Sequence, residues 1–260
     1  RYPGLEYIVM DGGSTDETPA ILERYATHFA HVQSARDAGQ ADAIKRGFER
    51  STGEIMVYLN SDDLLAPGAL FAVAAYFDRH PPVDAVYSHR CSIGSDNTVL
   101  AYWRLPRHSD FLMKRWDLIP QETTFWRRRI HEKVGGIDAS FRFAMDYDLF
   151  ARFMIRGRME RVDRFYGAFR RHPDSKTTQL METIGRAEVE RVRTERRIHR
   201  TPLDPWIGHA FVRAVERSGA VFADTKQQRP GSLPGIGWNY DRLWGNQLGR
   251  RDVPPLAVKS

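Results

Sequence analysis

Apolar and polar positions along the chain form a pattern of short strands separated by helices. Runs rich in β-branched and aromatic residues predict strands over residues 6–11, 31–34, 54–59, 84–89, 123–127 and 160–170. Apolar residues at helical spacing predict helices around residues 21–25, over 41–50 and over 146–155, with a further helix beginning at Pro67. Strands and helices alternate most regularly in the first half.

The C-terminal part has a different character. Residues 181–200 predict a basic amphipathic helix in which Ile184, Val192 and Ile198 are the sparse apolar positions. The residues after it are rich in Pro, Gly, Trp and Arg and show little periodicity, which predicts an irregular tail. We therefore divide the chain into two parts, a domain over residues 1–180 and an extension over residues 181–260.

Strands joined through helices of about ten or more residues indicate right-handed crossovers and an α/β fold. The prediction is a Rossmann-like, mainly parallel sheet flanked by helices, with a helical and irregular C-terminal extension. Ligands of such sheets bind beyond the carboxyl ends of the strands. That rule places Asp11 and residues 60–63 at one edge of the sheet.

The composition is that of a folded protein. A 42% apolar content with 12% aromatic residues is sufficient for a core, and 260 residues suit one large domain or a domain with an appendage. Cys91 is the one cysteine, which excludes an intramolecular disulfide framework and agrees with a reducing compartment. No apolar run approaches the ~18 residues that span a bilayer.

The net charge of +6 leaves three kinds of partner open: nucleic acid, an anionic membrane surface, or a phosphorylated small substrate. No nucleic-acid motif is present, neither paired Cys/His ligands nor an aromatic-basic strand. Basic runs such as Arg127-Arg128-Arg129 and Arg196-Arg197 have two interpretations. We favour a solvated basic face, and an interfacial role is the alternative.

Asn60-Ser61-Asp62-Asp63 directly follows an apolar predicted strand. Carboxylates in such a place are costly unless they meet a cation. Mg²⁺ or Mn²⁺ uses one or two carboxylates and takes further ligands from water and phosphate oxygens, which is how a nucleotide diphosphate is held. The alternative is an Asp-rich N-cap for the helix that begins near Pro67. The run by itself leaves both interpretations open.

Two further loops follow predicted strands. Asp11-Gly12-Gly13-Ser14 combines a carboxylate with glycines that permit a tight turn before a helix N-terminus, where a nucleotide could bind. The stretch over residues 36–42 places Arg36, Asp37, Gln40 and Asp42 at the start of a helix, as candidates for contact with the nucleotide or sugar. An ordinary strand–turn–helix connection and a salt-bridged cap are the structural alternatives.

Two late motifs carry titratable groups. Asp146 and Asp148 open a helix, where one could act as a general base or both could complement the helix dipole. In Arg170-Arg171-His172-Pro173 a neutral His172 is a candidate metal ligand and the arginines are candidate diphosphate partners, with a surface turn as the alternative.

The motifs together, in their order, resemble the family-two glycosyltransferases of the GT-A fold from about Tyr2 to Thr178. The matching stretches are YPGLEYIVMDGGSTDET, RDAGQADAIKRGF, STGEIMVYLNSDDLLAPGAL, IPQETTFWRR, VGGIDASFRFAMDYDLFARF and RRHPDSKT. The residues from about 181 onward match no family that we recognise.

The resemblance implies an inverting, metal-dependent glycosyltransferase that uses a nucleotide-sugar. It makes Asp62 and His172 the ligands of Mg²⁺ or Mn²⁺ and Asp146 the catalytic base. Gln121 corresponds to a residue that lines the acceptor side. The implied nucleotide-sugar-binding residues are Asp11, Gly13, Ser14, Arg36, Asp37, Gln40, Asp42, Asn60, Ser61 and Gln121.

The chain departs from the family pattern at several places. Asn60 replaces the first carboxylate of the strand-end Asp-x-Asp motif, Gly12 replaces a carboxylate that often contacts the nucleobase, and Met145 replaces a glutamate. Family members also carry a strand, loop and helix of about 35 residues ahead of Tyr2, close to one βα unit. From these departures we expect an N-terminally incomplete GT-A domain or a protein of weakened activity.

Three functional hypotheses follow. The first is a glycosyltransferase of cell-surface polysaccharide or glycolipid synthesis, acting on a saccharide or lipid-linked acceptor. The second is a nucleotide-sugar-binding relative with weak or no turnover. The third is a basic membrane-surface or nucleic-acid adaptor. Under the first two hypotheses we expect no nucleic-acid partner. We expect a cytoplasmic protein, with the basic C-terminal region as the candidate for peripheral contact with the inner face of the membrane.

Overall fold

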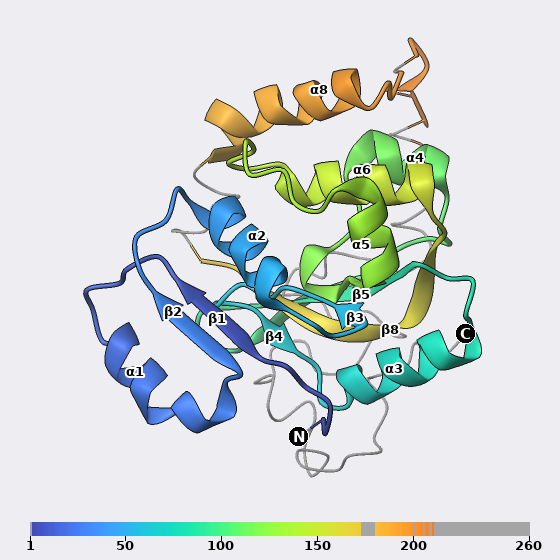
Figure 1. Ribbon diagram of the computed structural model, residues 1–260. Coiled ribbons are helices and arrows are strands. Elements are labelled where there is room, and N and C mark those ends of the chain that lie inside the picture. The colour runs from blue at the N-terminus through green and yellow to red at the C-terminus, as the bar shows by residue number, and fades with distance from the viewer. Residues whose placement is uncertain (1, 173–179, 200, 205, 208–209, 211–260) are drawn as a thin grey trace.

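The computed structural model describes residues 2–172, 180–199, 201–204, 206–207 and 210, and it is layered (Figure 1). Three helices cover one face of the central sheet: α2 (Gln40–Arg50), α5 (Arg128–Val134) and α6 (Met145–Arg156). Helix α3 (Ala69–Arg79) covers the opposite face. The α/β class predicted from the alternation of elements is confirmed.

A small parallel sheet at one side contains the first two strands, β1 (Ile8–Asp11) and β2 (His31–Ser34). Their connection contains α1 (Thr18–Arg24) and a 3₁₀ turn, η1 (Ala26–His28). Helix α2 packs closely on β1, because a Cβ atom on Gly47 would lie 3.2 Å from Cγ of Met10. Within the described residues no backbone hydrogen bond joins this small sheet to the larger one.

The larger sheet has the strand order β3-β7-β5-β8-β4, with β6 paired to β5. The strands are β3 (Ile55–Met56), β4 (Leu64–Leu65), β5 (Ala85–Ile93), β6 (Val99–Trp103), β7 (Phe125–Arg127) and β8 (Met159–Arg170). Strands β5 and β8 run parallel, whereas the other neighbours are antiparallel. The prediction of a mainly parallel sheet is therefore corrected to a mixed sheet. One cause is the tight turn between β5 and β6, where Asn97 adopts a φ of 65° and no crossover helix intervenes.

Two apolar cores lie on the two faces of the larger sheet. Successive residues of a strand point to opposite faces. Ala85 and Tyr87 of β5 therefore join the core under α5 and α6, whereas Val86 joins the core over α3. On β7, Trp126 and Phe125 divide in the same way. Strand β5 is thus the shared wall of both cores.

Several elements were not predicted from the sequence. They are β4, β6, α5, helix α4 (Asp110–Trp116) and the 3₁₀ turn η2 (Gln121–Thr123). Each is short or follows another element without a polar boundary, so its periodicity covers too few residues to be recognised.

The predicted basic helix is present as a turn of π-helix, η3 (Met181–Gly185), followed by α8 (Arg186–Glu195). Helix α8 lies across the outer side of α6 (Figure 1). Val192 and Ile198 are buried in the same core as α6, as the apolar pattern predicted. The division of the chain at residue 180 stays a prediction, and most of the predicted irregular tail lies outside the described residues.

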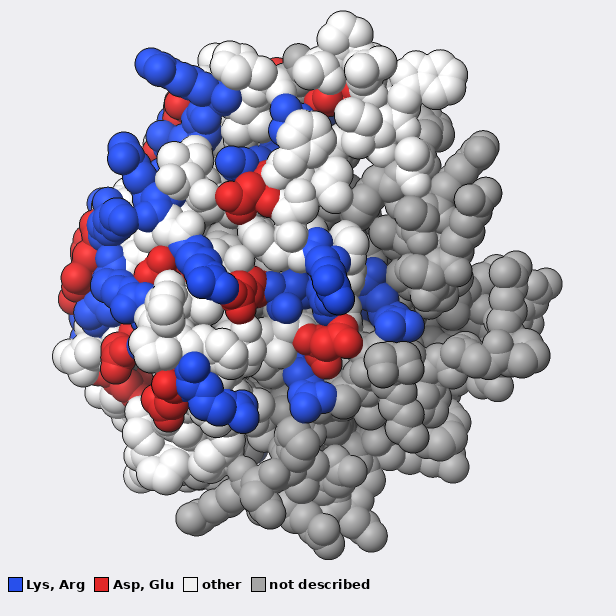
Figure 2. All heavy atoms as spheres, turned by 90° about the vertical axis from the view of Figure 1, so that its right-hand side faces the viewer, with Lys and Arg blue, Asp and Glu red and all other residues white. Residues whose placement is uncertain are grey.

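The prediction of a solvated basic face agrees with the exposed Arg129 and Arg197, but it is wrong for Arg127 and Arg196. The Arg127 guanidinium donates to Glu54 and to the carbonyl oxygens of Phe77 and Val83, and Arg196 donates to the buried Asp148. On the face shown in Figure 2, basic and acidic side chains are interspersed rather than gathered into one basic patch.

Candidate active site

Asp11 ends β1, and both of its carboxylate oxygens accept hydrogen bonds. The Ser14 hydroxyl donates to Oδ1 at 2.6 Å and the Ser14 backbone N–H donates to Oδ2 at 3.1 Å. The Ser34 hydroxyl donates to Oδ2 at 2.5 Å. These bonds, that of the Ser14 hydroxyl first, lower the pKa of Asp11. Ser34 was missed in the sequence analysis, and the signal that could have found it is its position at the end of the strand beside β1.

The turn after β1 touches the loop after β2. Gly13 has a φ of 88°, and a Cβ atom there would lie 3.2 Å from the backbone nitrogen of Arg36. A Cβ atom on Gly12 would lie 3.0 Å from Oδ2 of Asp37. Glycine at both positions therefore permits the close approach of the two loops. The structure brings together the residues that were predicted to bind the nucleotide in these loops, and their roles stay predictions.

Asn60 connects these loops to the end of β3. Its Oδ1 accepts a hydrogen bond from Nε2 of Gln40 at 2.6 Å, at the start of α2. Its Nδ2 donates to Oε1 of Gln121 at 3.3 Å and lies 3.5 Å from Oδ2 of Asp63. Gln121 in turn donates to the backbone oxygen of Tyr58. Three predicted site residues, Gln40, Asn60 and Gln121, thus form one hydrogen-bonded chain.

Asp62 and His172 are paired, although 110 residues separate them. Nε2 of His172 lies 2.9 Å from Oδ2 of Asp62. The His172 side chain is 25% exposed and the Asp62 side chain is 35% exposed, so a ligand can reach both. The predicted metal ligands are therefore neighbours at an accessible edge.

Asp63 differs from its neighbour Asp62 by being buried. Its Oδ1 accepts the backbone N–H of Arg170 at 2.9 Å. Burial, and then the negative charge of Glu122, raise the pKa of Asp63 to about 7. Asp62, with a side chain that is 35% exposed, is therefore more accessible than the buried Asp63.

Arg170 holds the Asp62–Asp63 loop in place. Its Nε donates to the backbone oxygen of Asp62 at 2.7 Å, and its Nη1 donates to the backbone oxygen of Gly94 at 2.9 Å and to Oδ1 of Asn97 at 2.6 Å. The loop is thus tied to β8 and to the turn between β5 and β6. These bonds make Arg170 a structural clamp of the loop, and the diphosphate role considered for it from the sequence stays a prediction.

A buried ion pair beneath the site was not predicted. Arg90 of β5 donates through Nε and Nη2 to both carboxylate oxygens of Glu122 at 2.7 and 2.8 Å. The guanidinium also lies over the rings of Trp103 and Phe169, at 5.3 and 4.6 Å from their centroids. Glu122 directly follows Gln121, so the pair fixes the turn that presents Gln121. A glutamate inside the QETTFW stretch was the only sequence signal for it.

Asp146 lies in the first turn of α6, and its Oδ1 accepts the backbone N–H of Tyr147 at 2.9 Å. Burial raises the pKa of Asp146, the positive charge of Arg90 lowers it, and the negative charge of Glu122 raises it further. Burial, and then the charge of Asp146, raise the pKa of Asp117. Asp117 has a φ of 48° at the end of α4. Asp146 is therefore a carboxyl group of raised basicity that feels the charges of Arg90 and Glu122.

Two predicted residues lie at the edge of this group. Asp42 accepts the backbone N–H of Ala38 at 3.2 Å and pairs with Arg46 at 3.5 Å on α2. Ser61 is exposed beside Asp62. Ligand roles for both stay predictions.

The pair formed by Asp62 and His172 supplies two side chains of the kinds that can bind a divalent cation. A carboxylate oxygen and an imidazole nitrogen are both accepted ligands, and a hard cation takes its remaining ligands from phosphate oxygens and water. In the part of the chain that the structure describes, no group of three or more His, Cys, Asp or Glu side chains is arranged to hold a metal.

Comparison with curated proteins identifies relatives that match a little more than half of the chain. The chain is 30% identical over 148 residues to a PGL/p-HBAD biosynthesis glycosyltransferase of Mycobacterium bovis (strain BCG / Pasteur 1173P2), covering 55% of the chain and 56% of the relative. It is 28% identical over 158 residues to an uncharacterized glycosyltransferase of Mycobacterium tuberculosis (strain ATCC 25618 / H37Rv), covering 58% of each. The chain thus spans little more than half the length of these relatives.

Solved structures share the fold at low sequence identity. S. aureus TarS (residues 1–349) in complex with UDP-GlcNAc superposes with a TM-score of 0.56 at 17% identity, covering 67% of the chain and 52% of TarS. The mannosyltransferase PcManGT of Pyrobaculum calidifontis, in complex with GDP-Man and Mn²⁺, gives a TM-score of 0.53 at 18% identity, covering 89% and 68%. Both support the GT-A fold.

A family model described as glycosyl transferase family 2 matches residues 1–149. This stretch contains the loops of Asp11 and Asp37, the Asn60–Asp63 run, Gln121 and Asp146. Because the match covers more than half of its 260 residues, the chain belongs to glycosyl transferase family 2.

Proposed function

We propose that the chain transfers a sugar, with inversion, from a nucleotide-diphosphate donor to a hydroxyl group of a saccharide or lipid-linked acceptor. The observation that carries the proposal is the accessible Asp62–His172 pair at the edge that also holds the Asn60–Gln121 chain. The pKa of Asp146 is raised, and the charges of the ion pair that adjoins Gln121 act on it. The candidate cation site and the candidate base therefore come from different elements, the Asp62 loop with the end of β8 for the first and the start of α6 for the second.

The donor proposal is supported by the folds that resemble this chain. TarS is described in complex with UDP-GlcNAc, and PcManGT in complex with GDP-Man and Mn²⁺. In this chain the loops after β1 and β2 would take the nucleoside, and Asn60 and Gln40 would lie next to the diphosphate. Gly12 leaves the loop without a second carboxylate, so Asp11 and Asp37 are the groups that would select the base.

In the proposed reaction Asp146 accepts the proton of the acceptor hydroxyl while the oxygen forms a bond to the anomeric carbon. The bond between that carbon and the diphosphate oxygen breaks on the opposite face, which inverts the configuration. A base is most effective when its pKa lies near the working pH, and the raised pKa of Asp146 moves it in that direction.

Asp62 and His172 would hold Mg²⁺ or Mn²⁺. When bound, the cation supplies positive charge beside the diphosphate as negative charge develops on it. Arg170 keeps the backbone of Asp62 fixed, so the carboxylate is oriented before the donor arrives.

The acceptor proposal rests on the relative named for PGL/p-HBAD biosynthesis, and we propose a role in polysaccharide or glycolipid synthesis at the cytoplasmic side of the membrane.

None of the described helices combines the length and the apolar content needed to cross a bilayer. Leu203 and Trp206, which follow α8, are 64% and 77% exposed and would make peripheral contact with lipid. Sedimentation with phosphatidylglycerol vesicles, lost in Trp206→Ala, would support this contact.

The decisive experiment measures turnover and metal-dependent binding in matched variants. Wild type should release UDP from UDP-GlcNAc or GDP from GDP-mannose in Mn²⁺, and either nucleotide-sugar should raise the melting temperature. Asp62→Ala should lose the Mn²⁺-dependent shift, whereas Asp78→Ala, on the exposed side of α3, should keep it. Asp146→Asn should keep the shift and lose about 10²–10⁴-fold in kcat.

Two outcomes would contradict the proposal. An unchanged shift in Asp62→Ala would remove Asp62 from the metal site. Full turnover in Asp146→Asn would remove the base. Nucleotide-sugar binding without turnover in the wild type would favour the weak or inactive relative over the active enzyme.

A further inference from the structure

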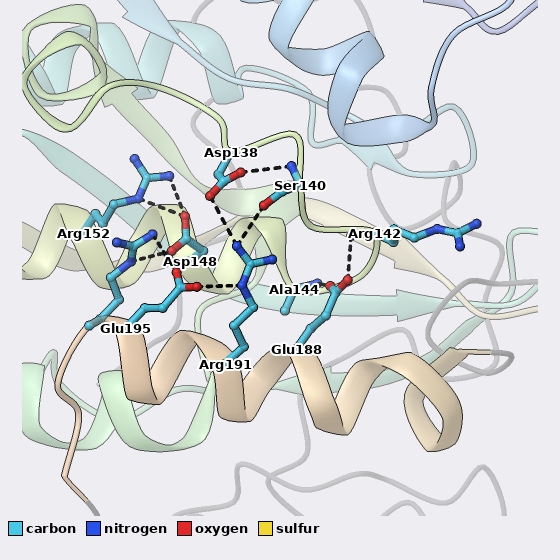
Figure 3. A network of polar contacts seen from close by, with 10 residues as sticks. Asp138, Ser140, Arg142, Ala144, Asp148, Arg152, Glu188, Arg191 and Glu195 are labelled. Carbon is cyan, nitrogen blue, oxygen red and sulfur yellow. Dashed lines mark hydrogen bonds and ion pairs between the residues drawn. The ribbon is translucent and has the colours of Figure 1, made fainter.

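The carboxylate of Glu188, from α8, lies at the beginning of α6. Oε1 accepts the backbone N–H of Arg142 at 2.9 Å, and Oε2 accepts those of Phe143 and Ala144 at 2.7 and 2.9 Å. Figure 3 shows Glu188 pointing from its helix toward this turn. Glu188 is 9% exposed, so the three bonds form away from bulk water.

Helix α6 lacks a cap of its own. Ala144 is its N-cap residue and has no side chain that can accept a hydrogen bond. The amide groups that lead into a helix need partners, and a negative charge there interacts favourably with the helix dipole. Glu188 supplies both functions from a segment more than 40 residues away in sequence.

Helix α8 is itself held firmly against α6. Arg196 donates to Oδ1 of Asp148 at 2.7 Å, and Asp148, fully buried, also accepts from Arg152. A Cβ atom on Gly185 would lie 3.0 Å from the ring of Phe143, so the helix start packs closely there. Glu188 is therefore presented by a fixed element and not by a mobile surface side chain.

We propose that Glu188 is a positioning residue for Asp146. This inference rests on the proposed role of Asp146 as the base. Asp146 follows Ala144 by two residues, and its Oδ1 accepts the N–H of Tyr147 in the same turn. The position of the Asp146 carboxylate thus depends on where α6 begins, and Glu188 fixes that point. The basic extension contributes to the active site through one acidic residue.

The test compares Glu188→Gln with Glu182→Gln in the full chain. Glutamine keeps the size of the side chain but loses the charge and one of the two accepting oxygens. Glu182 lies on η3, is 69% exposed and pairs with Arg186, so it provides the same change of charge without contact with α6. Hydrogen exchange of residues 142–147 should become about tenfold faster in Glu188→Gln and stay unchanged in Glu182→Gln. Exchange at the wild-type rate in Glu188→Gln would overturn the role.

Turnover separates positioning from mere stability. With UDP-GlcNAc or GDP-mannose and Mn²⁺, Glu188→Gln should lower kcat about tenfold because small displacements of a catalytic group are costly. The donor KM should stay within about twofold, since the donor contacts come from other elements. An unchanged kcat, or an equal loss in kcat and in donor binding, would overturn the inference.

The failure of this inference can be distinguished from the failure of the proposed function. If Asp146→Asn keeps full turnover, the base assignment is wrong, whatever Glu188→Gln does. If Asp146→Asn loses turnover and Glu188→Gln behaves like Glu182→Gln, the base stands and the positioning role is wrong.

Discussion

His89 is buried on β5, and both of its ring nitrogens have partners. Nδ1 accepts the backbone N–H of Leu105 at 3.0 Å, so the neutral ring carries its proton on Nε2, which donates to Oδ1 of Asp163 at 2.8 Å. Burial lowers the pKa of His89 to about 4, although the hydrogen bond with Asp163 opposes this shift. The folded protein therefore resists protonation of this ring.

The pH dependence of stability follows from this residue. Between pH 6.5 and 4 the unfolded chain binds a proton at His89 that the folded chain does not bind, so stability falls as the pH falls. The contribution to the free energy of unfolding is about 3 kcal/mol over that window. Urea unfolding at several pH values gives the free energy of unfolding as a function of pH. The slope of that dependence should be smaller in His89→Gln than in the wild type, and it should be unchanged in His28→Gln, where the histidine is exposed. Equal slopes in all three proteins would contradict the prediction.

At the scale of single residues, the sequence indicated several side chains that lie close together, but it missed some of the residues that they contact. It singled out Asp62 and His172 through their motifs, and the structure places them 2.9 Å apart. It could not separate Asp63 from Asp62, because adjacent residues differ in burial only after β8 has packed beside them. Arg90 also escaped prediction, since nothing in a strand pattern shows which distant glutamate a buried arginine will meet.

At the scale of elements, the Asp62–Asp63 loop depends on its clamp to β8. Arg170→Met removes donors to the backbone oxygen of Asp62 and to the turn between β5 and β6. We expect a loss of about 2–3 kcal/mol in the free energy of unfolding, because several charged hydrogen bonds are lost. The Mn²⁺-dependent thermal shift with UDP-GlcNAc should also weaken.

Arg158→Met is the matched control for the clamp. Arg158 lies before the same strand, is 62% exposed and pairs with Glu160, so its loss should change stability by less than about 1 kcal/mol. If both variants show the same thermal shift as the wild type, Arg170 does not support the metal loop.

The order of the elements was easier to predict than their directions. The run over residues 54–59 was expected to form one strand, yet only Ile55 and Met56 pair in a ladder, because β7 beside them is short. The predicted parallel sheet assumed that every connection is a crossover. The connection from β5 to β6 is a tight turn, and such a turn reverses the chain.

At the scale of the whole molecule, α8 belongs to the same core as α6. Val192 has no exposed surface and packs in the cluster that includes Leu149 and Phe153. Val192→Ala should lower the free energy of unfolding by about 1–2 kcal/mol, through lost burial and a small cavity. Thermal unfolding should remain one cooperative transition, with a lower midpoint.

Leu203→Ala provides the comparison for that experiment. Leu203 is 64% exposed, so its truncation should change stability by less than about 0.5 kcal/mol. A separate early transition in Val192→Ala, with the main midpoint unchanged, would show instead that α8 unfolds independently. That result would favour the division at residue 180.

The small β1–β2 sheet shares no strand ladder with the larger sheet in the described residues. Gln40, at the start of the helix that packs on β1, is hydrogen-bonded to Asn60 in the loop after β3. If the donor binds as proposed, its nucleoside contacts the loops of one sheet and its diphosphate those of the other. The bound donor then connects the two parts. Donor affinity and the stiffness of this junction are then thermodynamically linked. A substitution that weakens the contacts between the two sheets should therefore increase the rate at which the nucleotide product is released. A substitution that strengthens them should decrease that rate.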